Sequence, residues 1–224
     1  MKTILLTNQQ KKEYQEKGYL VIKNLIAPEE VNQLRADYDR AVSGEIKVPE
    51  FAGNKKKGKV VQLQNPSQYI PGWKYHVYFQ KAWSVARQLG GDDIEYGYDQ
   101  IIFKPEGATG ETAWHQDAAY WKKDRSRQRA LTCWLALSPA FKENGCMQFV
   151  PGSHLGEIQE HARITEKSEI TEALETKVDP SRAVVCPLEA GDASFHHCRT
   201  LHYTGGNFSD VPRRGLITHF FAKD

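Results

Sequence analysis

The stretch WHQDAAYW, at residues 114–121, places two metal-binding side chains, His115 and Asp117, one residue apart. Residues at positions i and i+2 of an extended strand point to the same face. An imidazole and a carboxylate could therefore reach one point in space and bind a divalent cation. Taken alone, the same two residues also fit a turn that is capped by the aspartate and carries a surface histidine.

A third ligand is expected from GDASFHHCRTLHYTGGN, at residues 191–207, which contains His196, His197 and His202. If this stretch is a strand, His196, Cys198 and His202 share one face and His197 lies on the other. Two histidines and one carboxylate on one face of a metal form the facial triad of non-haem Fe(II) oxygenases. This triad leaves three positions open, which suits a bidentate co-substrate and dioxygen.

The composition places limits on the class of protein. The chain has 224 residues, of which 40% are hydrophobic and 26% charged, with a net charge of +2. This length suits one domain over 1–224, and the charge is too balanced to indicate a nucleic-acid or membrane partner. No stretch approaches the roughly 18–20 apolar residues of a membrane span, and the first apolar run is too short for a signal peptide. We therefore expect a cytoplasmic protein.

The cysteines form no CxxC pair, so we expect free thiols in that compartment. They are Cys133, Cys146, Cys186 and Cys198. The short basic runs at 55–59 and 122–129 are expected to be solvated loops.

Periodicity and turn residues predict the elements that would position the candidate ligands. Capping signals and helical spacing favour helices over 7–17, 28–42 and 75–89. Short β-branched and apolar runs predict strands near 19–25, 95–104, 131–137, 147–150, 182–187, 193–203 and 215–222. Residues 45–72 are expected to be irregular, and 155–178 to form a polar insertion loop. Helices followed by many short strands indicate an α+β domain whose sheet part is a sandwich or barrel.

Three ordered motifs carry a resemblance to a known family. They are W-H-x-D at 114–117, E-N-G-C-x-x-F-V-P-G-S-H at 143–154, and G-D-x-x-F-H-H-x(4)-H-x-x-G-x-N-x-S-x-x-P-R-R at 191–214. This combination resembles the phytanoyl-CoA dioxygenase family, whose members are Fe(II)- and 2-oxoglutarate-dependent oxygenases. The likeness runs from about residue 8 to residue 221.

The resemblance implies a fold and a set of site residues. The fold would be a double-stranded β-helix (a jelly-roll, cupin-like core), with the N-terminal helices packed on one sheet. His115, Asp117 and His202 would be the iron ligands. The arginine that binds 2-oxoglutarate would stand eleven positions after the distal histidine, at Arg213. The planar guanidinium of arginine binds a carboxylate bidentately, and Arg214 would point to the opposite strand face.

Further contacts to the co-substrate are expected from Gln100 and Thr204, and Ser209 is a weaker candidate. Arg213 could instead be a surface residue that is paired with Asp210 or Asp192.

Several neighbours of the motifs have two interpretations. His196 could replace His202 as a ligand, or pack below the metal. Tyr120 and Trp121 could line the pocket or pack in the core. Cys198 could be a soft ligand, although a small apolar filler is favoured.

The implied activity is hydroxylation of a small molecule by a non-haem Fe(II)- and 2-oxoglutarate-dependent dioxygenase. Fe(II), 2-oxoglutarate and O2 would be required, and succinate and CO2 released. The substrate would be a natural product, an amino acid or an acyl-type metabolite. Related halogenases have a small residue in place of the ligand carboxylate, so Asp117 favours hydroxylation. The alternatives are a cupin-like protein that binds a metal or small ligand without turnover, and a zinc hydrolase, for which no general base is evident.

Overall fold

The computed structural model describes residues 4–49, 59–121, 129–164 and 173–223. Its helices are α1 (Asn8–Lys17), α2 (Pro28–Ser43), α3 (Pro66–Tyr69) and α4 (Val77–Gly90). The Thr7 hydroxyl accepts a hydrogen bond from the Gln10 amide at the start of α1, and Gly18 ends that helix in the left-handed conformation, at φ 79°. The three helices expected from capping signals and periodicity are therefore confirmed to within two residues.

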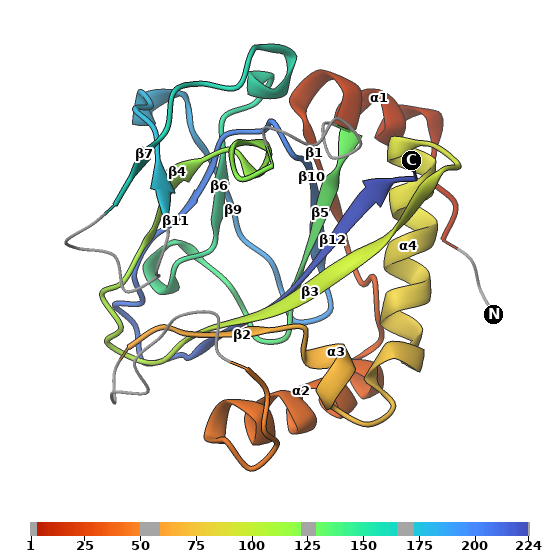
Figure 1. The fold of residues 1–224 in the computed structure, drawn as a ribbon, viewed down its shortest axis with the longest axis vertical. Coiled ribbons are helices and arrows are strands. Elements are labelled where there is room, and N and C mark those ends of the chain that lie inside the picture. Colours follow the sequence, from red (N-terminus) through yellow and green to blue (C-terminus); the bar gives the residue numbers. More distant parts are fainter. Residues whose placement is uncertain (1–3, 50–58, 122–128, 165–172, 224) are drawn as a thin grey trace.

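Two antiparallel sheets make up most of the remaining chain (Figure 1). The six-stranded sheet has the order β1 (Tyr19–Ile22), β10 (Ala193–His197), β5 (Leu131–Ala136), β12 (Arg213–Ala222), β3 (Ile94–Lys104), β2 (Val61–Gln64). The four-stranded sheet has the order β4 (Thr112–His115), β11 (His202–Thr204), β6 (Met147–Phe149), β9 (Val184–Cys186). A separate pair is formed by β7 (Ala162–Arg163) and β8 (Leu174–Glu175).

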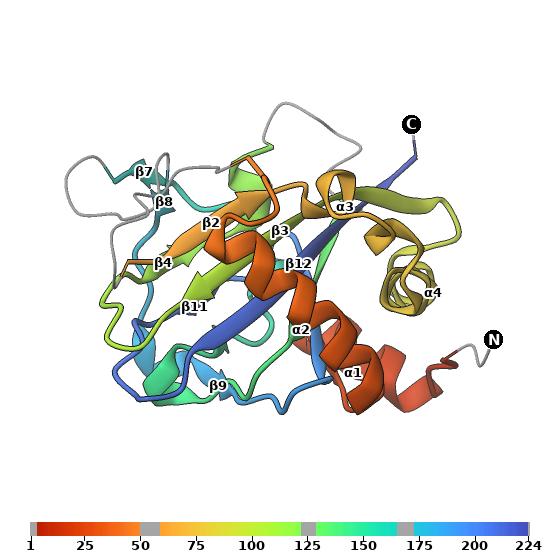
Figure 2. The ribbon, with the colours of Figure 1, turned by 90° about the horizontal axis from the view of Figure 1, so that it is seen from below.

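The two faces of the six-stranded sheet have different neighbours (Figures 1 and 2). Leu216 and Phe220 of β12 pack in one core with Leu34 and Tyr38 of α2 and Val85 of α4. Side chains alternate between the two faces of a strand, so every second residue of β12 faces away from the helices. The expected packing of the N-terminal helices on one sheet is therefore confirmed.

A second apolar cluster joins the opposite face of this sheet to the four-stranded sheet. It contains Trp134 and Ile217 from the first sheet and Met147 and Phe149 from the second. The space between the sheets is therefore partly filled by a core, and the residues that extend beyond this core are available to form a site.

The expected strand over 193–203 is wrong as one continuous element. β10 ends at His197, a turn follows, and β11 begins at His202 in the other sheet. Cys198 donates its backbone N–H to Ala130, and Thr200 donates its own to His197, so the chain leaves one sheet before it enters the next.

Two other expectations need correction. The segment 45–72, expected to be irregular, contains β2 and α3. β2 is a strand because its backbone pairs with β3. The segment 155–178, expected to be a polar insertion loop, contains the short paired strands β7 and β8 in its described part. Residues 165–172 and most of the basic runs at 55–59 and 122–129 lie outside the described residues. No helix of the described chain is long and apolar enough to cross a membrane.

Candidate metal centre and active site

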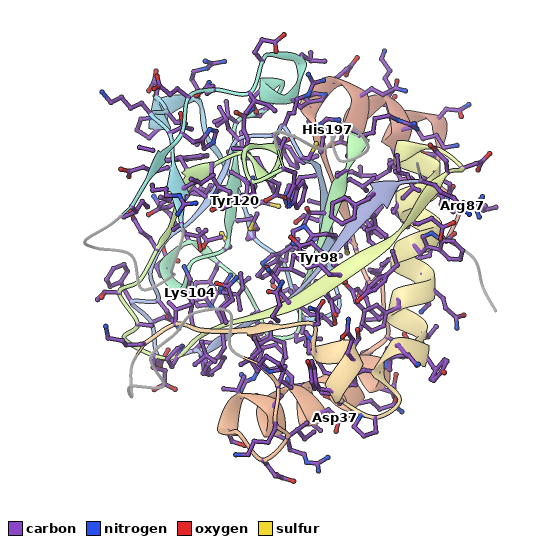
Figure 3. The ribbon with its side chains drawn as sticks, in the orientation of Figure 1. Asp37, Arg87, Tyr98, Lys104, Tyr120 and His197 are labelled. Carbon is purple, nitrogen blue, oxygen red and sulfur yellow. The ribbon has the colours of Figure 1, made fainter. Side chains whose placement is uncertain are left out.

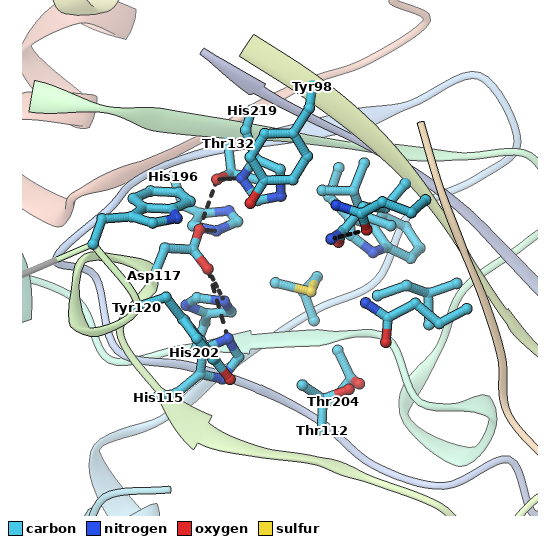
Figure 4. A pocket seen from close by; sticks show the side chains of 18 of the residues that line it. Tyr98, Thr112, His115, Asp117, Tyr120, Thr132, His196, His202, Thr204 and His219 are labelled. Atoms are coloured by element: carbon cyan, nitrogen blue, oxygen red, sulfur yellow. Dashed lines mark hydrogen bonds and ion pairs between the residues drawn. The ribbon is translucent and has the colours of Figure 1, made fainter. Parts of the chain in front are cut away.

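The three candidate ligands come together at one end of the four-stranded sheet (Figure 4). β4 and β11 are antiparallel neighbours, and His115 lies directly opposite His202 in their register. Asp117 follows β4 as the first residue of a 3-10 turn. One ligand atom from each residue lies within 4.8 Å of the others. The structure thus brings together the three residues that the motifs indicated.

Both histidines present the same ring nitrogen to the aspartate. Nδ1 of His115 lies 2.8 Å from the carbonyl oxygen of Ala113, and Nδ1 of His202 lies 2.9 Å from that of Thr200. An Nδ1–H that donates to a backbone carbonyl leaves the lone pair on Nε2, as in many metal-binding histidines. Each Nε2 lies 3.6 Å from Oδ1 of Asp117, so three donor atoms converge on one point.

The electrostatics of the cluster favour the forms that bind a metal. Burial lowers the pKa of His202 well below its usual value, and His115 and His196 lower it further. Burial alone would raise the pKa of Asp117, but His202, with hydrogen bonds from His115 and His196, holds it well below the usual range. A neutral imidazole and a carboxylate are therefore present at neutral pH, and these are the protonation states that metal binding requires.

The second oxygen of the Asp117 carboxylate is held by side chains of the six-stranded sheet. The Thr132 hydroxyl donates to Oδ2 at 2.6 Å, and Nε2 of His196 lies 3.3 Å from the same oxygen. Nδ1 of His219 in turn lies 3.0 Å from the Thr132 hydroxyl. Oδ2 is thus occupied inside the protein, while Oδ1 faces the two histidines. His196 therefore contacts the carboxylate from behind, and the cluster that could hold a metal contains His202 and not His196.

A cavity of about 350 Å³ lies beside this cluster, between the two sheets. Figure 3 shows Tyr98 and Tyr120 in this interior region, and Figure 4 shows them on either side of Asp117. The six-stranded sheet lines the cavity with Gln62, Gln64, Tyr98, Gln100, Ile102, Thr132, Trp134, His196, Arg213, Ile217 and His219. The remaining lining residues are Thr112, His115, Asp117, Tyr120, Trp121, Met147, His202 and Thr204.

Arg213 lines this cavity as a buried cation. It is 1% exposed, and its guanidinium lies over the Trp134 ring at 5.3 Å. Its Nε has no hydrogen-bond partner, and Nη2 makes one long contact of 3.4 Å with the carbonyl of Ile102. Among the described residues it forms no ion pair, and Asp192, an alternative partner, is bound to Lys23 at 2.7 Å. Burial lowers the pKa of Arg213 to about 10.

A buried guanidinium with unused donors and no counter-charge fits a ligand carboxylate. The neighbouring Arg214 points to the helix side, as expected, and binds Asp39 at 2.7 Å.

Of the other residues expected to contact the co-substrate, Gln100 and Thr204 line the cavity and Ser209 does not. Gln100 lines the cavity and donates to Oε1 of Gln64 at 2.9 Å. Thr204 also lines it, but its hydroxyl accepts a hydrogen bond from Lys104 at 2.9 Å. Ser209 is not among the lining residues, because its hydroxyl is hydrogen-bonded within its own loop.

The residues with two interpretations are now placed. Tyr120 and Trp121 line the cavity. Cys198 packs with Ala118 and Ala130, and burial raises the pKa of its thiol to about 12. It is therefore an apolar filler and not a thiolate ligand. None of the four cysteines forms a disulfide bond, as expected.

Thr132, His219 and Gln62 have no distinctive motif, and the sequence analysis did not single them out. The signal that could have found them is the alternation of β2, β5 and β12, but it becomes specific only when the register between these strands is known.

The geometry defines a class of protein: a buried two-histidine, one-carboxylate cluster with open positions is typical of non-haem Fe(II) oxygenases. The model of the phytanoyl-CoA dioxygenase family (PhyH) matches residues 14–215, and the chain belongs to this family. This membership makes it a non-haem Fe(II)- and 2-oxoglutarate-dependent dioxygenase, as its motifs implied.

Known relatives share the fold over nearly the whole chain. The chain is 29% identical, over 96% of its length and 79% of the relative, to the probable alpha-ketoglutarate-dependent hypophosphite dioxygenase of Stutzerimonas stutzeri. It is 25% identical, over 98% of its length and 70% of the relative, to the peroxisomal phytanoyl-CoA dioxygenase of Mus musculus. The crystal structure of EvdO2 from Micromonospora carbonacea var. aurantiaca with 2-oxoglutarate has a TM-score of 0.83 and 29% identity, covering 99% of this chain and 93% of that one.

Proposed function

We propose that this protein hydroxylates a small molecule, with oxidative decarboxylation of 2-oxoglutarate to succinate and CO2. His115, Asp117 and His202 would hold Fe(II), and Arg213 would bind the distal carboxylate of 2-oxoglutarate. Bound iron would supply the activation of dioxygen. The single observation that carries the proposal is that the triad and an unpaired buried arginine share one cavity.

The side chains of the protein would act by positioning. The carbonyls of Ala113 and Thr200 fix the two imidazoles, and the Thr132 hydroxyl fixes the carboxylate. Trp134 would support the guanidinium from below while the co-substrate lies along β12, and Gln100, one strand away, would contact it. Thr204, whose hydroxyl oxygen accepts a hydrogen bond from Lys104, would donate its O–H to an oxygen of the co-substrate. We further propose that the two facing sheets form a double-stranded β-helix.

Asp117 also bears on the outcome of the reaction. Its Oδ1 faces both histidines at 3.6 Å, where it would occupy one metal position and leave no vacancy there for halide. We therefore propose hydroxylation and not halogenation. Product analysis in chloride buffer tests this step, since a chlorinated product from the wild-type protein would contradict it.

The proposed site is tested by anaerobic titration with Fe(II), followed by 2-oxoglutarate, while the visible charge-transfer band is recorded. Arg213→Met should weaken 2-oxoglutarate binding by at least about 100-fold, because a bidentate charged contact is lost. Arg214→Met is the matched control, since this neighbour is bound to Asp39 on the other face. Asp117→Ala should perturb the band itself.

Two results would refute the assignment. If metal binds but no band forms with 2-oxoglutarate, the cupin-like binder becomes the better account. If Arg213→Met and Arg214→Met have equal effects on co-substrate affinity, the role of Arg213 is wrong.

A further inference from the structure

The permanent charges of the cavity are few. Among the described residues that line it, Arg213 is the single permanent cation and Asp117 the single carboxylate. In the function proposed above, the co-substrate takes the first and the iron takes the second. An anionic primary substrate would therefore be buried without a permanent counter-charge from the described lining, which is strongly unfavourable.

A row of amides lies on the side of the cavity away from Arg213. Gln64 of β2 pairs with Gln100 of β3, and Gln62 pairs with Ile102. β3 lies between β2 and β12, so Gln62 and Gln64 stand two strands, or about 10 Å, from the strand of Arg213. This separation places them beside the space proposed for 2-oxoglutarate.

Gln62 carries the observation that indicates a ligand. Its side chain is 95% buried and lines the cavity, and its Oε1 has no hydrogen-bond partner within the described chain. A buried amide oxygen without a partner is uncommon, because burial removes its hydrogen bond to water and the loss costs free energy unless another donor replaces it. A hydroxyl or N–H group of a bound molecule would satisfy it.

An aromatic surface stands at the metal end of the same side. The rings of Tyr98 and His219 stack at 4.4 Å, and Trp121 meets His219 edge-on at 5.5 Å. Tyr98 and Thr132 both pair with His219 across the sheet, so this surface is level with the support of Asp117. The flat or apolar face of a ring could pack here within reach of the iron.

From these observations, and resting on the proposed function, we propose that the primary substrate is an uncharged small ring compound that bears hydroxyl or amide groups. Its ring would pack near Tyr98, and its polar groups would bind Gln62 and Gln64. The cavity, at about 350 Å³, lies near the lower end of the usual range for small-molecule sites. The anionic substrates named for relatives, hypophosphite and a CoA thioester, do not match this chemistry.

The test uses the wild-type protein loaded with Fe(II) and 2-oxoglutarate under anaerobic conditions. Three matched pairs of probes are titrated while the charge-transfer band is followed: 4-hydroxyphenylacetamide and 4-hydroxyphenylacetate, nicotinamide and nicotinate, methyl glucoside and glucose 6-phosphate. At least one neutral probe should perturb the band and bind 10-fold or more tightly than its anionic counterpart. The proposal is overturned if no neutral probe perturbs the band, or if the anions bind more tightly.

Variants locate the effect. Gln62→Met and Gln64→Met should each weaken binding of the neutral probe by 10-fold or more. Gln62→Met should also leave the dissociation constant of 2-oxoglutarate unchanged, whereas Gln64 accepts a hydrogen bond from Gln100, a proposed co-substrate contact, and does not serve as this control. Gln62→Asn keeps an amide and checks that any loss is not a folding defect. Reduced affinity for 2-oxoglutarate in Gln62→Met would overturn the assignment, since this residue would then serve the co-substrate. Failure of the proposed function is distinguishable, because the band would then be absent before any probe is added.

Discussion

Replacing Thr132 by valine tests whether the outer contacts of Asp117 matter for metal binding. Valine has nearly the same shape but cannot donate to Oδ2, which the threonine hydroxyl reaches at 2.6 Å. A hydrogen bond to a charged group contributes about 1.5–3 kcal/mol, and every 1.4 kcal/mol is a factor of ten. Loss of an outer partner of a metal ligand typically costs about 10–100-fold in affinity. We therefore expect Thr132→Val to weaken Fe(II) binding by about 10- to 100-fold.

The assay is anaerobic titration with Fe(II), with Mn(II) as a redox-stable replacement. Thr132→Ser should retain most of the affinity because the hydroxyl remains. Thr218→Val is a matched control, since it removes a hydroxyl bonded to Tyr78 at 2.8 Å on the opposite face of the same sheet. It should lower stability without changing metal affinity. Wild-type affinity in Thr132→Val, or an equal loss in both valine variants, would refute the reasoning.

Three further outcomes follow from the buried groups. Burial lowers the pKa of Arg213 from 12.5 to about 10, so a penalty of roughly 3 kcal/mol is fully present below pH 10. Arg213→Met should therefore not lower, and should tend to raise, the melting temperature of the apo protein at pH 7; a large decrease would contradict this. Gly215→Ala would place a Cβ 2.7 Å from the Trp134 ring, so we expect a loss of about 1–3 kcal/mol in chemical denaturation and weaker 2-oxoglutarate binding. An unchanged variant would show that Trp134 can shift freely. Burial raises the pKa of the cysteine thiols to about 11 or 12, so at pH 8 a thiol reagent should modify none of them in the native protein and all of them after denaturation: Cys133, Cys146, Cys186 and Cys198.

The parts of the site that could be predicted from the sequence are those encoded by local spacing. His115 and Asp117 are one residue apart, and the family resemblance placed Arg213 eleven residues after His202, just past a loop whose Gly and Asn residues mark its turns. The Asn207 side chain accepts a hydrogen bond from the backbone N–H of Ser209, an Asx-type bond that fixes this loop locally. Local chemistry of this kind does not depend on which strands become neighbours.

The parts that could not be predicted depend on pairing between distant segments. Thr132 and His219 meet because β5 and β12 pair in one particular register, and a slip of either strand by one residue would turn its own side chain to the helix face. The change of sheet between His197 and His202 was also missed, because no Gly, Pro, Asn or Asp stands between these two residues to mark a turn. β2 was missed since its four residues lie among Gly- and Lys-rich neighbours and gain their strand character from pairing with β3.

The site joins two structural units that are otherwise held together mainly by apolar packing. His115 and His202 belong to the four-stranded sheet, whereas Thr132, His196 and Arg213 belong to the sheet that the helices cover. Asp117 connects them, because one of its oxygens faces the histidines and the other is held by Thr132. A metal ion bound to Oδ1 would therefore link the sheets through a single carboxylate, and its binding free energy would add to the stability of their packing. The support of this carboxylate comes from the helix-backed sheet that also carries Arg213, so in the proposed function the position of Asp117 would set the place of the metal relative to Arg213 and to the co-substrate.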